Sequence, residues 1–173
     1  MTKNTQNITY QYHTKYNVKS KAINAIREAV QVDGLWKAAN KGETEKCLMI
    51  LGNIGKKLCE IYKIGLHGEV TYGYFEAYFF VDKRITLVKP SIVSYLHEFR
   101  HHWQTMTGKH LSSEPDARKW SLSAFRKAFP EAFDDAWKLG RLMWMPPYPT
   151  VEVTRDSLRE RLQRERNREE KEE

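Results

Sequence analysis

Three side chains within five residues have types and a spacing that suit metal-dependent hydrolysis. His97, Glu98 and His101 form the pattern H-E-x-x-H within the stretch LHEFRH. On a helix, positions i and i+4 lie on one face, so both imidazoles can point at one metal ion. Zinc (Zn2+) held by three protein ligands keeps a position for water, whose pKa it lowers. The pattern therefore predicts a zinc site at which Glu98 is the general base.

The third ligand is expected downstream, where four side chains have suitable chemistry: His102, His110, Glu114 and Asp116. His102 points about 100° away from His101 around a helix, which excludes it from the same site. Glu114 is preferred, because it begins the next predicted helix on a face of mostly small residues that would let two helices approach closely. His110 is the alternative. Asp116 could hydrogen-bond a ligating imidazole or stabilise the first turn of its helix.

Helices and a short sheet are predicted to position these residues. Apolar residues recur at helical spacing, and the expected helices cover residues 20–32, 44–63, 91–105, 114–128 and 130–144. Ser91 can cap the third of these helices, and Gly108 follows its end. Residues 68–88 are rich in β-branched and aromatic side chains, with Asp82-Lys83 placed for a hairpin. We expect an α+β fold with a small, mostly antiparallel sheet of about three strands, packed with the active-site helix and several further helices.

Composition limits the setting in which this chemistry would occur. No run of about eighteen apolar residues is present, and the polar N-terminus lacks a secretory signal, so a cytoplasmic protein without a membrane partner is expected. The net charge of +7 favours acidic partners, but the basic residues are spread along the chain, which makes nucleic acid the weaker expectation. Cys47 and Cys59 are separated by about 18 Å on one predicted helix, too far for a disulfide.

The stretch of residues 85–125 resembles gluzincin-type metallopeptidases with a minimal catalytic domain, particularly the ImmA/IrrE-like group and related phage-encoded peptidases. The matching pieces are a strand (ITLV), a helix with LHEFRH, and a helix that opens with E-x-x-A at Glu114. The resemblance implies zinc bound by His97, His101 and Glu114, with Glu98 as the base. It also implies an edge strand, from residues 74–88, that aligns an extended substrate.

This resemblance implies a zincin-like metallopeptidase domain at residues 20–144. A polar arm is expected at residues 1–19, and a Pro-containing linker with a charged C-terminal helix at residues 145–173. The predicted function is hydrolysis of peptide bonds of an intracellular protein, in a phage or a bacterium.

Two alternatives stay open on the same residues. Twelve residues separate His101 from Glu114, a short spacing that also resembles SprT-like proteins, which are associated with DNA. In that family the third ligand is a downstream histidine, here His110, although the chain has no Cys-x-x-Cys zinc ribbon. The other alternative is a catalytically silent binding module on a zincin scaffold.

Overall fold

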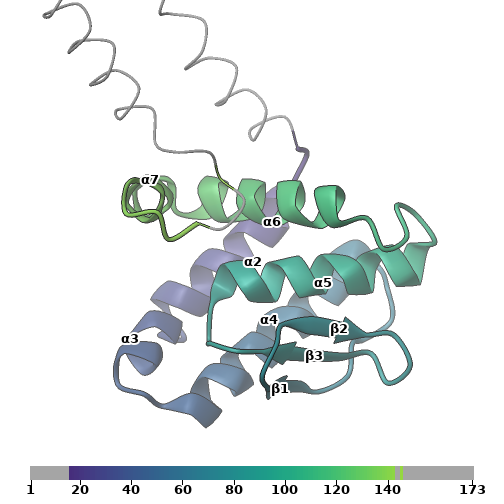
Figure 1. The fold of residues 1–173 in the computed structure, drawn as a ribbon, viewed down its shortest axis with the longest axis horizontal. Helices are drawn as coiled ribbons and strands as arrows, with labels where there is room; N and C mark the ends of the chain where they lie inside the picture. Colours follow the sequence, from purple (N-terminus) through teal and green to yellow (C-terminus); the bar gives the residue numbers. More distant parts are fainter. Residues whose placement is uncertain (1–15, 143–144, 146–173) are drawn as a thin grey trace, which may run out of the picture.

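The structure, a computed structural model, describes residues 16–142 and residue 145 (Figure 1). The fold is α+β, as the sequence predicts. Its helices are α2 (Ser20–Gln31), α3 (Leu35–Asn40), α4 (Thr44–Tyr62), α5 (Ile92–Thr107), α6 (Glu114–Ala128) and α7 (Pro130–Lys138). Its strands are β1 (Val70–Tyr72), β2 (Ala77–Phe79) and β3 (Arg84–Leu87). Within these described ranges, no helix combines the length and the apolar character that crossing a bilayer requires.

The sheet is mixed, which corrects the prediction of a mostly antiparallel sheet. The strand order is β1-β3-β2, with β1 parallel to β3 and β2 antiparallel to β3. The N–H of Gly73 still donates to the carbonyl of Leu87 (2.9 Å) as the chain leaves β1 and crosses to the far side of β3. The turn that contains Asp82 and Lys83 then joins β2 and β3 as the predicted hairpin. Side-chain alternation identifies the buried face of a strand but not its direction, so the parallel pair was not predictable.

Most predicted helices are confirmed within two residues, and two differences have simple physical causes. Helix α3 was not predicted, because six residues are too few to show a helical period. Helix α7 ends at Lys138 rather than near Trp144, because Gly140 adopts a left-handed conformation (φ 64°) that turns the chain.

Helix α5 occupies the centre of the molecule, beside α6 on one side and the strands on the other (Figure 1). Its apolar residues Tyr95, Leu96 and Phe99 are fully buried. Phe99 packs on Trp120 of α6, with ring centroids 6.0 Å apart. The helix that carries the motif is therefore held by the core on several sides, which fixes the direction of its polar side chains.

The described residues that precede α2 pack on the helices. Val18 is buried, and the ammonium group of Lys127 donates to the carbonyl of Tyr16 (2.8 Å). The rest of the predicted polar arm, residues 1–15, lies outside the described residues, as does nearly all of the predicted linker and charged helix at 145–173. Cys47 and Cys59 are buried and unpaired, as predicted.

Candidate metal centre

The two histidines of the motif lie one turn apart on the same face of α5. The helix begins where the Ser91 hydroxyl accepts a hydrogen bond from the N–H of Ser94 (3.3 Å), and it ends at Gly108, whose φ is 68°. Both signals were predicted from the sequence. The Nε2 atoms of His97 and His101 are 3.3 Å apart, and their rings are nearly perpendicular (84°). Two imidazole nitrogens thus meet at one point, as metal binding requires.

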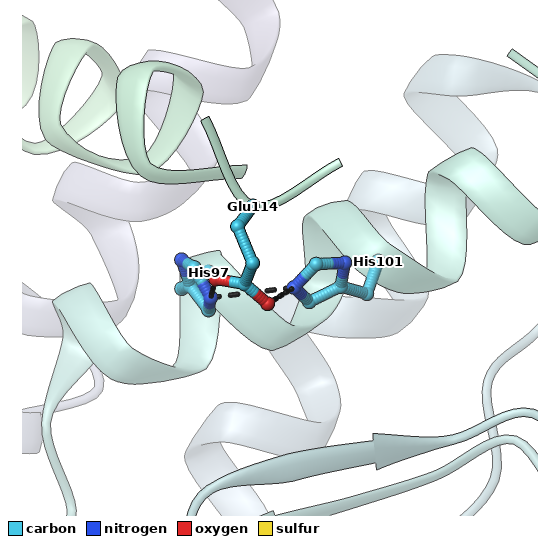
Figure 2. A group of neighbouring side chains, drawn as sticks. All are labelled: His97, His101 and Glu114. Atoms are coloured by element: carbon cyan, nitrogen blue, oxygen red, sulfur yellow. Dashed lines mark hydrogen bonds and ion pairs between the residues drawn. The ribbon is translucent and has the colours of Figure 1, made fainter. Parts of the chain in front are cut away.

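Helix α6 brings Glu114 to the same point. The turn after Gly108 reverses the chain, and the Ser113 hydroxyl caps α6 by accepting from the N–H of Asp116 (3.4 Å). Glu114 is therefore the first residue of α6, and its side chain extends toward α5 (Figure 2). Its Oε2 lies 3.2 Å from Nε2 of His97, and its Oε1 lies 3.1 Å from Nε2 of His101. We call these three residues the His-His-Glu group.

The alternative third ligands lie elsewhere. His110 is exposed on the turn before α6, with a left-handed backbone (φ 53°). His102 is fully buried and faces away from the His-His-Glu group, as predicted from its position on the helix. Among the described residues, His97, His101 and Glu114 form the one group of three ligand atoms close enough to share an ion, all within 4.8 Å of one another.

The proton on the His101 ring is placed by its neighbours. The amide nitrogen of Gln104 donates to the carbonyl of Ser113 (3.0 Å) and to the carboxylate of Asp116 (2.8 Å). Both partners are acceptors, so this end of the amide is the NH2 group, and its oxygen faces Nδ1 of His101 at 2.9 Å. Nδ1 must therefore donate, and in the neutral ring the lone pair of Nε2 points at Glu114. Asp116 thus acts on the imidazole through Gln104, a contact that the sequence did not reveal.

The spacing of these atoms fits a zinc ion. Atoms bound at about 2.0–2.1 Å to a tetrahedral ion lie roughly 3.3–3.4 Å from one another. The measured separations within the His-His-Glu group are 3.1, 3.2 and 3.3 Å. Burial, followed by the effect of His101, lowers the pKa of His97 to about 4, so its ring is neutral and able to bind metal at neutral pH. The lone pair on Nε2 of His101 faces the Glu114 carboxylate, and a cation between these two groups would turn their repulsion into attraction.

Glu98 lies beside this group and is buried, with 5% of its surface exposed. Its Oε1 is 4.0 Å from Nε2 of His97. The backbone of Tyr78 in β2 favours the charged form of Glu98 and by itself lowers its pKa. Burial raises the pKa of Glu98 to about 8, with further contributions from the charges of Glu114 and Glu76. A carboxyl group with a pKa close to neutrality can both accept and return a proton.

A cleft of about 300 Å3 runs between β2 and α5 and opens onto the His-His-Glu group. One wall is formed by residues 76–80 at the edge of the sheet, and the other by α5 and by Ser112 in the turn before α6. Glu98, His101 and Glu114 all line it. The cleft therefore gives a substrate access to the ligand atoms and to the proposed base.

A buried histidine, His102, and a half-buried one, His67, support the site without belonging to it. Nε2 of His102 donates to the carbonyl of Gly65 (2.8 Å), so its Nδ1 accepts from the hydroxyl of Tyr78 (3.0 Å). Nδ1 of His67 donates to the carbonyl of Gly68 (2.6 Å), and its Nε2 accepts from the hydroxyl of Tyr95 (2.9 Å). Burial lowers the pKa of both rings, that of His102 to about 4, so both are neutral. No local pattern predicts these pairs, because the partners lie on different elements.

A buried ion pair joins α5 to α6 behind the His-His-Glu group. The Nε of Arg100 donates to Oδ2 of Asp116 (2.7 Å), and its Nη2 donates to Oδ1 (3.2 Å). The guanidinium group also lies 3.7 Å from the ring centroid of Trp103. Burial raises the pKa of Asp116 to about 6 and lowers that of Arg100 to about 10, so both are charged at neutral pH. The pair fixes the helix spacing that lets Glu114 reach both histidines.

Comparison with known proteins finds no relative. No family model matches the chain, and no curated protein or solved structure is significantly similar to it. The chemistry of the site is therefore inferred from the positions of its own atoms.

Proposed function

We propose that this protein is a zinc-dependent metallopeptidase of zincin-like fold. The observation that supports this most strongly is the convergence of three ligand atoms, 3.1–3.3 Å apart, beside a buried glutamate in an accessible cleft. His97, His101 and Glu114 would hold the ion. Two imidazoles and one carboxylate are a donor set that catalytic zinc uses in peptidases.

Each residue of the site has a distinct task in this proposal. Zinc, when bound, acidifies water and polarises a peptide carbonyl. The Glu98 carboxylate accepts a proton on the cleft side of the His-His-Glu group and returns it to the leaving amine. The backbone of Tyr78 favours the charged form of that carboxylate. Gln104 and Asp116 keep the proton of His101 on Nδ1, which leaves Nε2 free for the metal.

The free edge of β2 is suited to align an extended peptide. Tyr78 is opposite Ile85 in the antiparallel pair, but the N–H of Ile85 donates to Glu69 on the other side of β3. The Tyr78–Ile85 pair therefore exchanges no hydrogen bonds, and the N–H and C=O of Tyr78 face away from β3. These outward-facing groups can form hydrogen bonds with a peptide laid along the strand.

The order of elements supports the resemblance to ImmA/IrrE-like peptidases better than that to SprT-like proteins. Strand β3, helix α5 with its motif and helix α6 with Glu114 at its start follow one another as that resemblance implies. Glu114 lies at the histidines and His110 does not. A nucleic-acid role, which depended on the SprT-like alternative, has correspondingly less support.

Metal content and cleavage test the proposal together. The full chain, its His97→Ala variant and its Glu98→Gln variant would be purified without chelator, and zinc per chain measured by elemental mass spectrometry. We expect about one zinc in the wild type and in Glu98→Gln, and none in His97→Ala. A mixed peptide library should then be cleaved by the wild type alone. If the wild type contains no zinc, the assignment of a metal centre is wrong. If Glu98→Gln still cleaves peptides, the assignment of Glu98 as the base is wrong.

A wild type that binds zinc and cleaves nothing would favour the silent binding module instead. The library is therefore also incubated with the zinc-loaded Glu98→Gln variant, and retained peptides are identified by mass spectrometry. Retention of peptides by both proteins, without products in either, would replace the peptidase assignment with a binding role.

A further inference from the structure

The cleft beside the metal centre is lined by acidic side chains, although the chain has a net charge of +7. Three carboxylates line it, those of Glu76, Glu98 and Glu114, and none of the described residues that line it is a lysine or an arginine. Glu114 and Glu98 have tasks in the proposed reaction. Glu76 has none, so its presence at this place calls for a separate explanation.

The Glu76 carboxylate lacks a counter-ion of its own. Within the part of the chain that the structure describes, no side chain forms a hydrogen bond or an ion pair with it, and it is half-buried. Its charge acts on Glu98 and raises the pKa of that base. A carboxylate that is accessible at the wall of a cleft and has no partner within the described residues is free to pair with a cation that arrives with the substrate.

Glu76 lies directly before β2 and lines the cleft in which a peptide would lie. Side chains two positions apart in a strand share a face, and Tyr78 points its hydroxyl at His102 on α5. Glu76 precedes Tyr78 by two residues, and Phe80 follows it by two. Both line the cleft, and the side chain of Phe80 is 71% exposed. A carboxylate and an exposed aromatic ring along one wall match a side chain with an apolar stem and a cationic end.

We propose that Glu76 is a specificity residue that binds a nitrogen cation of the substrate, so that the peptidase acts on peptides with a lysine or arginine side chain close to the cleaved bond. This inference rests on the proposed function. Phe80 contacts the stem of that side chain, and Glu76 pairs with its charged end. The α-amino group of a peptide is also a nitrogen cation, so the test distinguishes it from a lysine or arginine side chain.

Binding to the inactive protein tests this without relying on turnover. Zinc-loaded Glu98→Gln protein would be titrated with fluorescent peptides that differ at one position (lysine, norleucine or glutamate), each with a free or an acetylated amino terminus. We expect the lysine peptide to bind tightest, and Glu76→Gln in the same background to weaken it roughly tenfold to a hundredfold. Glu69→Gln, which removes an exposed charge outside the cleft, should change nothing.

Charge reversal separates recognition from a structural effect. Glu76→Lys should shift the preference from the lysine peptide to the glutamate peptide, which a merely disturbed strand would not do. A lysine preference that survives acetylation assigns the cation to the side chain, and tight binding that is lost on acetylation assigns it to the α-amino group. If the Glu98→Gln protein with Glu76 unchanged binds all peptides equally, the inference about Glu76 is overturned, but the metallopeptidase assignment is not. A protein that neither binds nor cleaves any peptide removes both.

Discussion

The hydroxyl of Tyr78 lies 3.0 Å from Nδ1 of His102, and this hydrogen bond joins the outer strand of the sheet to the helix that carries the motif. The other ring nitrogen of His102 donates to Gly65, so the ring is fixed from two sides. The backbone of Tyr78 also acts on Glu98 and lowers its pKa. One residue therefore connects the edge strand both to α5 and to the proposed base.

Removing the Tyr78 hydroxyl should weaken this connection. In Tyr78→Phe the buried Nδ1 of His102 loses its donor, and an unsatisfied buried acceptor costs about 1–3 kcal/mol. We expect the free energy of unfolding to fall by that amount in urea titrations. Tyr74→Phe is the matched control, because the Tyr74 side chain is fully exposed and should show no change. Equal stability of both variants would show that the hydrogen bond contributes nothing.

The contact of Gln104 with His101 should be visible in metal affinity. Gln104→Ala removes the acceptor that holds the His101 proton on Nδ1. Losing such a supporting contact typically lowers the metal affinity by roughly 10–100-fold. Competition with a chromophoric chelator measures the zinc dissociation constant. Thr105→Ala serves as the control, since that hydroxyl bonds to the backbone carbonyl of His101 and not to its ring. An unchanged dissociation constant in Gln104→Ala would contradict the assigned tautomer.

The Arg100–Asp116 pair should contribute strongly to stability once one partner is removed. Arg100→Met leaves the Asp116 carboxylate buried without its cation, which costs about 3–5 kcal/mol. Lys57→Met removes the exposed Lys57–Glu28 pair, which lies at 3.0 Å, and should cost less than about 1 kcal/mol. Urea titrations of the metal-free proteins compare the two. Adding Asp116→Asn to Arg100→Met should recover part of the loss, since it removes the unpaired charge.

Much of the fold and of the His-His-Glu group follows from local sequence signals. Ser91 and Gly108 mark the ends of α5, and the apolar residues between them show a helical period. Helix α6 begins at Glu114, and Ala117 and Ala124 on its inner face are fully buried, as close packing on α5 requires. These signals act within one element or between neighbouring elements, so the sequence alone was sufficient to predict them.

Most of the contacts that were not predicted join distant parts of the chain. The partners His102 and Gly65 are 37 residues apart, and Arg100 and Asp116 belong to different helices. The direction of β1 likewise depends on where the chain crosses β3, which no local pattern records. Side-chain type gives the capacity to form such bonds, and only tertiary packing selects the partner.

Acid should destabilise the metal-free protein through His67 and His102. Burial lowers the folded-state pKa of both rings, that of His102 to about 4, whereas the unfolded chain binds these protons near pH 6.5. The unfolded state therefore holds more protons between about pH 6.5 and 4, and stability is lost as the pH falls through that window. The shift of His102 alone corresponds to about 3 kcal/mol.

Urea titrations at several pH values, with chelator present, measure this loss. His67→Gln should make the fall in stability below pH 6.5 less steep than in the wild type. The exposed His110→Gln variant controls for the removal of a histidine as such. Glu98 also titrates in the metal-free protein, but near pH 8 and in both variants, so the difference between them isolates His67. Parallel curves for His67→Gln and His110→Gln would exclude this explanation.

Two glycines of α4 should respond in opposite ways to the same substitution. A methyl group at Gly55 would overlap the His67 ring and the Tyr95 hydroxyl, whereas one at Gly52 would meet nothing within 4 Å. Gly52→Ala should therefore stabilise the protein by about 1 kcal/mol, the difference in helix propensity. Gly55→Ala must displace the hydrogen-bonded pair and should destabilise it by about 1–3 kcal/mol. Thermal unfolding of the two variants compares them directly, and a stabilised Gly55→Ala would show that His67 and Tyr95 do not occupy the space beside α4.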